Sequence, residues 1–145
     1  MRFGTPFSKS DERALVRAIE SAELQTSAEL RIHIERRCPG YELDRAAEVF
    51  EALAMHQTQA RNGVLIYLAW KDRKFGVIGD IGIHQHVGDA FWEGVYAEAR
   101  SALSRQAWVE GLSAAVVAAG AALRAHFPRA QDDVNELPDA ISWGW

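Results

Sequence analysis

The sequence predicts one α/β domain in which a small mixed sheet carries helices on both faces. Helical periodicities alternate with short strand patterns along 145 residues, a length typical of a single domain. Residues 64–70 are almost continuously apolar, which is typical of a central strand covered on both sides. A short charged loop at 71–74 leads into another strand pattern at 75–79, and this spacing indicates a hairpin. We therefore expect residues 1–145 to form one domain, with 64–70 as its most buried strand.

The first helix and the first strand have clear local signals. Ser8 and Ser10 are alternative N-caps of a helix predicted over residues 9–24, in which apolar residues recur at helical spacing. Polar and apolar residues alternate strictly over 29–35, which predicts a strand with one buried face. Its polar residues are expected on the opposite, solvent-facing side, and they are Glu29, Arg31, His33 and Glu35.

Three further helices complete the regular structure. An apolar stripe predicts a helix over 42–58, and similar patterns predict helices over 86–104 and 108–127. Pro128 ends the last of these, because proline cannot continue a helix. We expect three strands in all.

An acidic and irregular tail is predicted from about residue 129. Trp143 and Trp145 lie in this tail. Two exposed tryptophans would lower solubility, so we expect both to pack on the domain.

The predicted topology gathers polar residues at one edge of the sheet. The segment 29–70 reads as strand, helix, strand, and this unit makes its two strands parallel. The hairpin then makes the strand at 75–79 antiparallel to its neighbour. The starts of the first two strands and the end of the third therefore share an edge, which should carry Thr26, Glu29, Asn62 and Asp80.

The segment Gly79-Asp80-Ile81-Gly82 is the most informative stretch for function. Flanking glycines let a ligand approach the carboxylate closely, and a carboxylate suits a hard cation that prefers oxygen ligands. The alternative is that Asp80 caps the turn that follows it. No phosphate-binding loop, nucleophile elbow, zinc spacing or dinucleotide fingerprint is present.

The other candidate site residues each have a structural alternative. Glu29 begins a strand, where glutamate is usually just solvated. Glu110 lies in the first turn of a predicted helix, where the helix dipole already favours a carboxylate. His84 and His86 are two residues apart near a helix start, where they would diverge rather than share a metal. Thr26, Asn62 and His84 are the residues expected to contact a ligand beside the acidic groups.

Composition excludes several classes of protein. The net charge of −4 argues against general binding to nucleic acid, which needs a basic patch. Cys38 is the single cysteine, so no disulfide forms within the chain. No apolar run reaches the roughly 18 residues needed to span a membrane, and the N-terminus lacks the apolar core of a secretory signal. From the sequence we expect a cytoplasmic protein without a membrane segment.

The order of several motifs resembles the TPM domain family. The resemblance spans about Phe7 to Trp145. It rests on Thr26-Ser27-Ala28-Glu29, on Phe75-Gly76-Val77-Ile78-Gly79-Asp80-Ile81-Gly82-Ile83-His84, on Glu110-Gly111-Leu112 and on Asn135-Glu136-Leu137-Pro138. It implies a three-layer α/β/α sandwich, divalent-cation binding at loops on one edge, and acid phosphatase activity in some members. By motif match, Asp80, Glu29 and Glu110 would be the metal-side carboxylates. Ala28 and His86 depart from the family pattern, which commonly has glycine and lysine there.

Three functions are compatible with these features. The first is a domain that binds calcium or magnesium without catalysis, as an accessory to a partner protein. The second is a metal-dependent phosphomonoesterase, in which the cation polarises a phosphoryl oxygen. Against it, no positioned nucleophile is apparent, and Arg31 and Arg61 are the nearest cationic candidates. The third is an interaction module that uses the aromatic tail. We favour the first.

Overall fold

The computed structural model describes residues 5–129 and 141–144. Its eight elements in chain order are α1 (Lys9–Glu23), β1 (Glu29–Glu35), α2 (Glu42–Ala52), β2 (Gly63–Ala69), β3 (Lys74–Gly79), α3 (Ile81–Ser104), α4 (Trp108–His126) and β4 (Ile141–Trp143). The strands form one sheet in the order β3-β2-β1-β4. β1 runs parallel to β2 and β4, and β2 runs antiparallel to β3. The predicted mixed sheet is therefore confirmed, and it has four strands rather than three.

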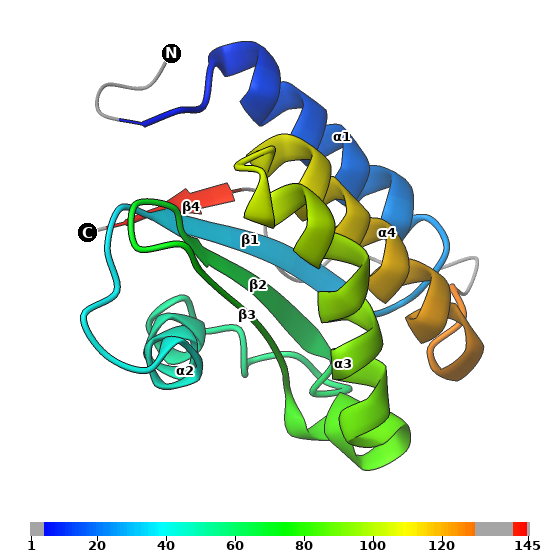
Figure 1. The fold of residues 1–145 in the computed structure, drawn as a ribbon. Helices are drawn as coiled ribbons and strands as arrows, with labels where there is room; N and C mark the ends of the chain where they lie inside the picture. Colours follow the sequence, from blue (N-terminus) through cyan, green and yellow to red (C-terminus); the bar gives the residue numbers. More distant parts are fainter. Residues whose placement is uncertain (1–4, 130–140, 145) are drawn as a thin grey trace.

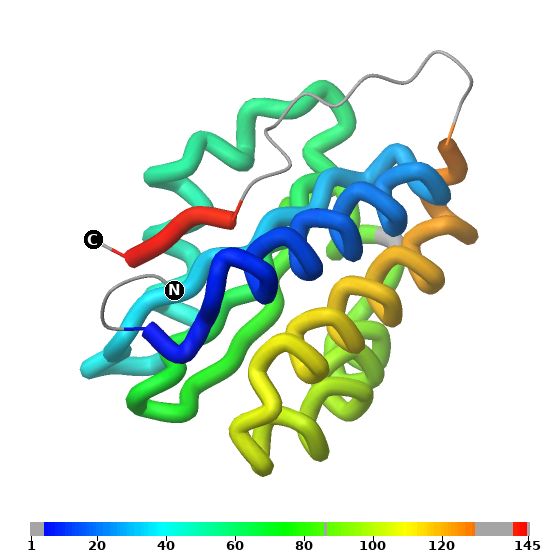
Figure 2. Tube along the Cα trace, turned by 90° about the horizontal axis from the view of Figure 1, so that it is seen from above, coloured from blue at the N-terminus to red at the C-terminus, as the bar shows by residue number. Residues whose placement is uncertain are grey.

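Helices cover both faces of this sheet, so the expected α/β/α sandwich is confirmed. α1, α3 and α4 lie on one face and α2 lies alone on the other (Figure 1). Seen from above, α1 and α4 run side by side (Figure 2). The side chains of β2 alternate between the two layers: Val64, Ile66 and Leu68 join the larger core under three helices, and Leu65, Tyr67 and Ala69 join the smaller one under α2. Every residue of β2 is buried, as predicted for a central strand.

Two helices differ from their predicted bounds. The helix predicted over 42–58 ends at Ala52, and turns follow it. α3 begins at Ile81, five residues before the predicted start, because the Asp80 side chain accepts a hydrogen bond from the Ile81 amide and caps the helix. Gly88 interrupts α3 with a φ of 70°, a conformation that glycine adopts without the strain of a Cβ.

The tail contributes structure that the sequence did not predict. β4 lies beside β1, and the edge of the Trp143 ring meets the Phe7 ring at a centroid distance of 5.8 Å. The Trp143 side chain packs against the larger core, so the prediction that this residue docks is confirmed. Trp145 lies outside the described residues.

The α4 helix is long and apolar enough to cross a membrane by length and composition alone. Within the described chain it packs on α1 and α3, and one of its faces is buried in the core. A core helix of a soluble protein has the same properties, so this is weak evidence for a membrane segment.

Candidate functional site

The strand register brings the predicted polar residues together at one end of the strands, which is the edge of the sheet named in the prediction. Glu29 is opposite Gly63, and Val64 is opposite Gly79, so the start of β1, the start of β2 and the end of β3 coincide. Glu29 and Asp80 are both buried at this edge. β2 lies between their strands, which places β1 and β3 about 10 Å apart. The two carboxylates therefore lie at the same end of the strands and on the same face of the sheet, but β2 separates the strands that carry them.

Asp80 combines a structural role with an ion pair. Its Oδ1 accepts a hydrogen bond of 2.8 Å from the Ile81 amide. Arg61 Nε and a terminal nitrogen of its guanidinium reach the two carboxylate oxygens at 2.7 and 2.8 Å. The Asp80 side chain is 6% exposed, whereas that of Arg61 is 47% exposed. The buried carboxylate is thus balanced by a cation that stays in contact with water.

The glycine after Asp80 sets the position of this arginine. A Cβ on Gly82 would lie 2.1 Å from the Ala60 carbonyl oxygen and 2.6 Å from that of Arg61. The Gly82 amide donates to the Arg61 carbonyl at 2.9 Å. Only glycine allows this close approach, which holds the loop carrying Arg61 against the start of α3.

A pocket of about 340 Å³ opens beside the ion pair, between α2 and the end of β3. Phe50, Ala47 and Ile78 supply its apolar part. Glu51 and His56 line it together with Arg61 and Asp80. Among the described residues, no three His, Cys, Asp or Glu side chains lie close enough together to hold a metal on their own.

Thr26 and Asn62 are buried at the same edge and join its loops. The Thr26 hydroxyl donates to the Phe127 carbonyl and accepts from the Ala28 amide at 3.2 Å. Asn62 donates from Nδ2 to the Ser27 carbonyl at 3.0 Å. Thr26 therefore links the residues before β1 to the end of α4, and Asn62 links the residues before β2 to those before β1.

His84 and Glu110 do not line the Asp80 pocket. His84 is exposed in the first turn of α3, and the Trp92 indole donates to its Nδ1 at 3.4 Å. Glu110 lies near the start of α4, which follows the far end of α3 from Asp80. It forms an exposed ion pair of 2.7 Å with Arg105. The structure thus does not bring Glu110 to Asp80.

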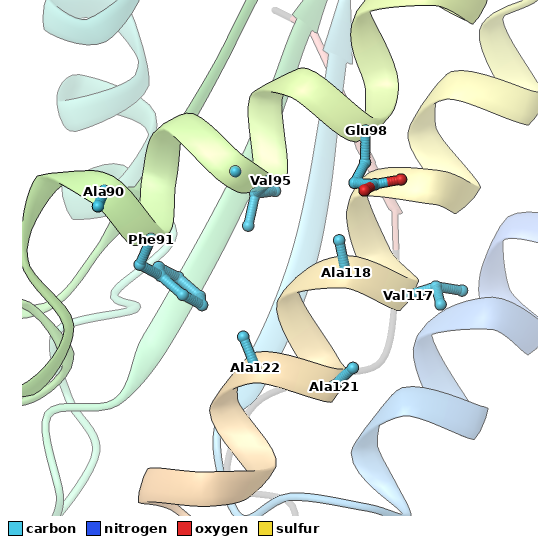
Figure 3. Close-up of a pocket in the computed structure, with 9 residues that line it drawn as sticks. Ala90, Phe91, Val95, Glu98, Val117, Ala118, Ala121 and Ala122 are labelled. Atoms are coloured by element: carbon cyan, nitrogen blue, oxygen red, sulfur yellow. The ribbon is translucent and has the colours of Figure 1, made fainter.

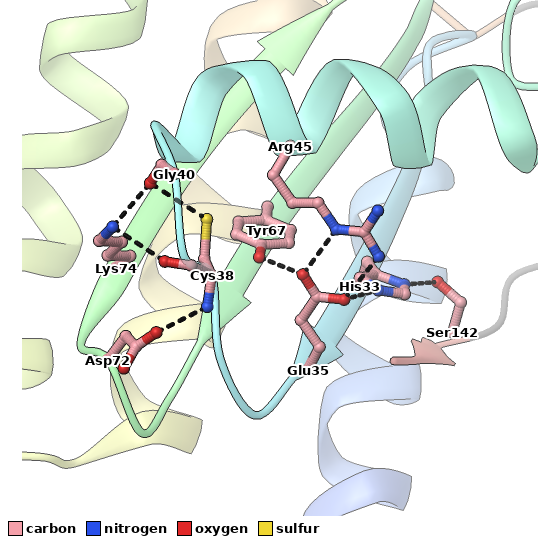
Figure 4. Close-up of polar contacts among 9 residues, drawn as sticks. All are labelled: His33, Glu35, Cys38, Gly40, Arg45, Tyr67, Asp72, Lys74 and Ser142. Atoms are coloured by element: carbon pink, nitrogen blue, oxygen red, sulfur yellow. Dashed lines mark hydrogen bonds and ion pairs between the residues drawn. The ribbon is translucent and has the colours of Figure 1, made fainter. Parts of the chain in front are cut away.

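A second polar cluster lies inside the protein, between the sheet and α2 (Figure 4). Arg45 binds the Glu35 carboxylate with two nitrogens at 2.8 and 2.9 Å. The Tyr67 hydroxyl donates to the same carboxylate. His33 contacts it through Nε2 at 3.3 Å and meets the Ser142 hydroxyl through Nδ1 at 2.7 Å. We call these five residues the Glu35 cluster.

The prediction of a solvent-facing side for β1 is wrong, and the Glu35 cluster explains why. His33 is 0% exposed and Glu35 is 8% exposed. α2 covers this side with the Arg45 guanidinium, and β4 adds Ser142, so His33 and Glu35 are each buried with hydrogen-bond partners. The linkage Ser142–His33–Glu35 resembles a hydrolase triad in its order. His33 and Ser142 are both buried, and their contact joins β4 to β1.

Burial and hydrogen bonding shift the titration of the Glu35 cluster. Burial lowers the pKa of His33, although the hydrogen bond to Glu35 opposes the shift. Burial would raise the pKa of Glu35, but hydrogen bonds from Arg45, Tyr67 and His33 outweigh it and hold that pKa below its ordinary value. Burial, followed by the hydrogen bond to Glu35, raises the pKa of Tyr67. The cluster is therefore a neutral imidazole beside a charged carboxylate near neutral pH.

These shifts predict that acid destabilises the protein in two steps. The folded-state pKa of His33 lies below its ordinary value of 6.5, so the unfolded chain takes up the proton first and stability falls as the pH drops below about 6.5. Glu35 adds a second loss below its ordinary value of 4.5, as its carboxylate becomes protonated. Urea unfolding at pH 7.5, 6.0 and 5.0 measures the first step. His33→Gln should flatten it, and His126→Gln, at an exposed position, should leave it; an unchanged slope in His33→Gln would contradict the assignment.

A further hollow, of about 650 Å³, lies between α3 and α4 (Figure 3). Small and apolar side chains line it, including Phe91, Val95 and four alanines. Glu98 is its single charged lining residue. This groove offers mainly apolar surface, and one carboxylate alone is too few oxygen ligands for a cation.

Comparisons with known proteins agree with this architecture. The family model described as TPM domain matches residues 4–122. The NMR structure of the BA42 protein from the psychrophilic bacterium Bizionia argentinensis is 38% identical, with a TM-score of 0.92 over 99% of each chain. The N-terminal domain of the cg2496 protein from Corynebacterium glutamicum is 19% identical, with a TM-score of 0.66 over 83% of this chain and 76% of that one, and it shows the fold alone. No curated protein matches the sequence.

Proposed function

The chain belongs to the TPM domain family, and from that premise we propose that it binds a divalent cation at the Asp80 pocket and acts as an accessory to another protein rather than as a catalyst. The observation that carries the proposal is a buried carboxylate whose charge is balanced by one half-exposed arginine. Because the Arg61 side chain is 47% exposed, it can turn into water and leave the carboxylate to another cation. A cation could take the place of the guanidinium without any change in the strands.

The chemistry of the pocket favours a hard cation held weakly. Asp80 supplies two oxygens, and Glu51 adds a carboxylate on the same pocket. Magnesium keeps several of its own waters, and calcium accepts water among its six to eight oxygen ligands, so both cations suit a site with few protein ligands. Glu29, one strand beyond β2, adds negative charge to the same edge. We expect a site that fills at millimolar rather than micromolar concentrations.

The exchange of Arg61 for a cation gives a prediction with opposite signs for two variants. Calcium or magnesium should raise the free energy of unfolding of the wild type, by about 1.4 kcal/mol at ten times the dissociation constant. Asp80→Asn should lose most of this gain, because the charge is gone while the cap oxygen remains. Arg61→Gln should bind the cation more tightly than the wild type, because the competing guanidinium is gone. Thermal unfolding with and without 10 mM calcium or magnesium measures all three.

Glu110→Gln is the matched control for this experiment. Glu110 pairs with Arg105 outside the pocket, so its substitution should leave the stabilisation by cations unchanged. A loss in Glu110→Gln would favour the ligand set implied by the family resemblance. An equal response of wild type, Asp80→Asn and Arg61→Gln would assign Asp80 to capping alone.

A metal-dependent phosphomonoesterase is the second candidate. Arg61 and His56 line the same pocket as Asp80, and cationic groups beside a metal would suit a phosphate. Hydrolysis of p-nitrophenyl phosphate, with and without magnesium, separates the two candidates. The accessory function predicts no turnover above the uncatalysed rate, whereas turnover that magnesium supports and Asp80→Asn removes would establish the enzyme.

A further inference from the structure

The outer edge of β3 has backbone groups without a strand to bind them. β3 is the last strand of the sheet on its side, between α2 and α3 (Figure 1). The Asp80 amide donates to the carbonyl of Gly63, the residue opposite it, at 2.9 Å. In an antiparallel pair this bonding alternates, so Lys74, Gly76 and Ile78 also face β2. The amides and carbonyls of Phe75, Val77 and Gly79 therefore point outward, and within the described chain they have no hydrogen-bond partner.

This edge lacks three of the features that commonly prevent strand pairing, although Leu43 of α2 lies close to Gly76 beside it. Natural edge strands are commonly protected by proline, by a bulge or by an exposed lysine. Residues 74–79 contain no proline, and the pairing with β2 is continuous from Ala69 to Val64. Lys74 is the one charged residue of the strand, and its Nζ is bound to the carbonyls of Cys38 and Gly40 at 2.9 and 2.6 Å. The lysine is thus turned to a neighbouring loop.

Both sides of the edge offer surface for the side chains of an added strand. On the α2 side, Tyr41 is 57% exposed and Leu43 is 36% exposed, and the Asp80 pocket opens beside Ile78. On the α3 side, Tyr96 is 37% exposed and its ring packs on Phe75 at a centroid distance of 5.4 Å. A strand has side chains on alternating faces, so one set would meet α2 and the other would meet Tyr96.

The charge at one end of the edge indicates the kind of strand that fits. Arg100 lies over the Tyr96 ring at 4.9 Å, and this ring packs on Phe75, two residues after Arg73 of the hairpin, which also carries Lys71. Arg100, Lys71 and Arg73 are exposed. The acidic residue of this hairpin, Asp72, is already paired with Arg37 at 3.1 Å. Glu42 of α2 also lies near the strand, beside Gly76, but the three exposed cations leave a net positive charge at this end that favours an acidic residue in the partner.

We infer that the β3 edge binds an extended peptide segment of a partner protein as a fifth strand, with alternating apolar residues and an acidic residue at the hairpin end. Main-chain hydrogen bonds to Phe75, Val77 and Gly79 would supply affinity, and the flanking surfaces would supply selectivity. The inference is independent of cation binding, because none of these contacts requires a metal.

A synthetic probe peptide tests the inference directly. The probe is Asp-Val-Thr-Val-Thr-Val-Asp with blocked ends, added to the full chain in EDTA and followed by backbone amide shifts and amide exchange. We expect saturable shifts centred on Phe75, Val77 and Gly79, and slower exchange of these amides. The same peptide with N-methyl groups on its five central residues lacks the donors, so it should bind at least about tenfold more weakly. Absence of shifts in β3 at millimolar probe would overturn the inference.

Two proline variants test the direction of the backbone groups. Val77→Pro removes an amide that points outward, which an edge strand tolerates, so the variant should fold and lose the probe. Ile78→Pro removes an amide that points to β2 and should unfold or strongly destabilise the protein. If Val77→Pro fails to fold, Arg100→Glu decides, because it leaves the backbone intact and should weaken the acidic probe but not a probe ending in serine. Unchanged affinity of the acidic probe in Arg100→Glu would contradict the inference.

The Arg100→Glu and Val77→Pro variants also show whether a second copy of this chain, rather than a partner protein, occupies the β3 edge. A second copy of this chain could also pair along β3. Sedimentation that shows a concentration-dependent dimer, absent in Arg100→Glu or Val77→Pro, would assign the edge to self-association and overturn the assignment to a partner protein.

Discussion

Replacing Glu35 by glutamine should lower the free energy of unfolding by about 3–5 kcal/mol, the cost of removing one member of a buried ion pair. The carboxylate accepts from Arg45, from the Tyr67 hydroxyl and from His33 at once. Glutamine has nearly the same shape but a single acceptor oxygen and no charge. Its amide nitrogen would face at least one of these donors, so a buried donor would lose its partner. Urea unfolding at pH 7.5 measures the loss.

Two controls separate this effect from a general loss of packing. Glu20→Gln, at an exposed position of α1, should change the free energy of unfolding by less than about 0.5 kcal/mol. Arg45→Gln combined with Glu35→Gln should cost less than the sum of the single changes, because the two side chains stabilise each other. A loss below about 1 kcal/mol in Glu35→Gln would show that water replaces the carboxylate, and the cluster would then contribute little to stability.

The strict alternation of residues 29–35 was enough to place β1, but not to assign its polar face. A single strand pattern reports which residues share a face and says nothing about what covers that face. The cover comes from Arg45 on α2 and from Tyr67 on β2, which meet β1 only in the folded sheet. Tyr67 is the one signal in the sequence, because it places a hydroxyl in an otherwise apolar buried strand that must find an acceptor.

Strand topology predicted the Asp80 edge better than residue type did. The parallel unit and the hairpin together placed Glu29, Asn62 and Asp80 at one end of the sheet, and the register confirms it. The sequence did not predict that Arg61 would form the ion pair with Asp80. Arg61 reaches it through a loop whose course depends on the contact with Gly82. Glu110 was a candidate metal ligand through motif order alone. The length of α3 separates it from the end of the sheet that carries Asp80.

β4 was missed because three residues are too few for a periodic signal. Ile141-Ser142-Trp143 follows a polar segment, and its pairing with β1 joins positions more than 100 residues apart. Such a strand depends on its tertiary partners rather than on local propensity. Its contribution to stability is therefore measurable by removing it.

Deleting residues 141–145 should lower the free energy of unfolding by about 3 kcal/mol, which corresponds to roughly 6–12 °C in the unfolding midpoint. The deletion exposes the apolar surface that Ile141 and Trp143 cover, including Phe7. It also removes Ser142 from His33 and the Gly144 amide from the Ile34 carbonyl, where the bond is 2.7 Å. Ordering the tail on the domain costs conformational entropy. The deletion removes this cost, so part of the lost free energy of unfolding is offset. Trp143→Ala should reproduce about half of the effect, and Leu24→Ala, at a residue that is 73% exposed, should have almost none.

Because the deletion leaves His33 without its Ser142 partner while Glu35 and Arg45 remain, it should also shift the pH at which the first acid step occurs. An unchanged midpoint together with an unchanged acid step would mean that β4 is not held on β1 in solution.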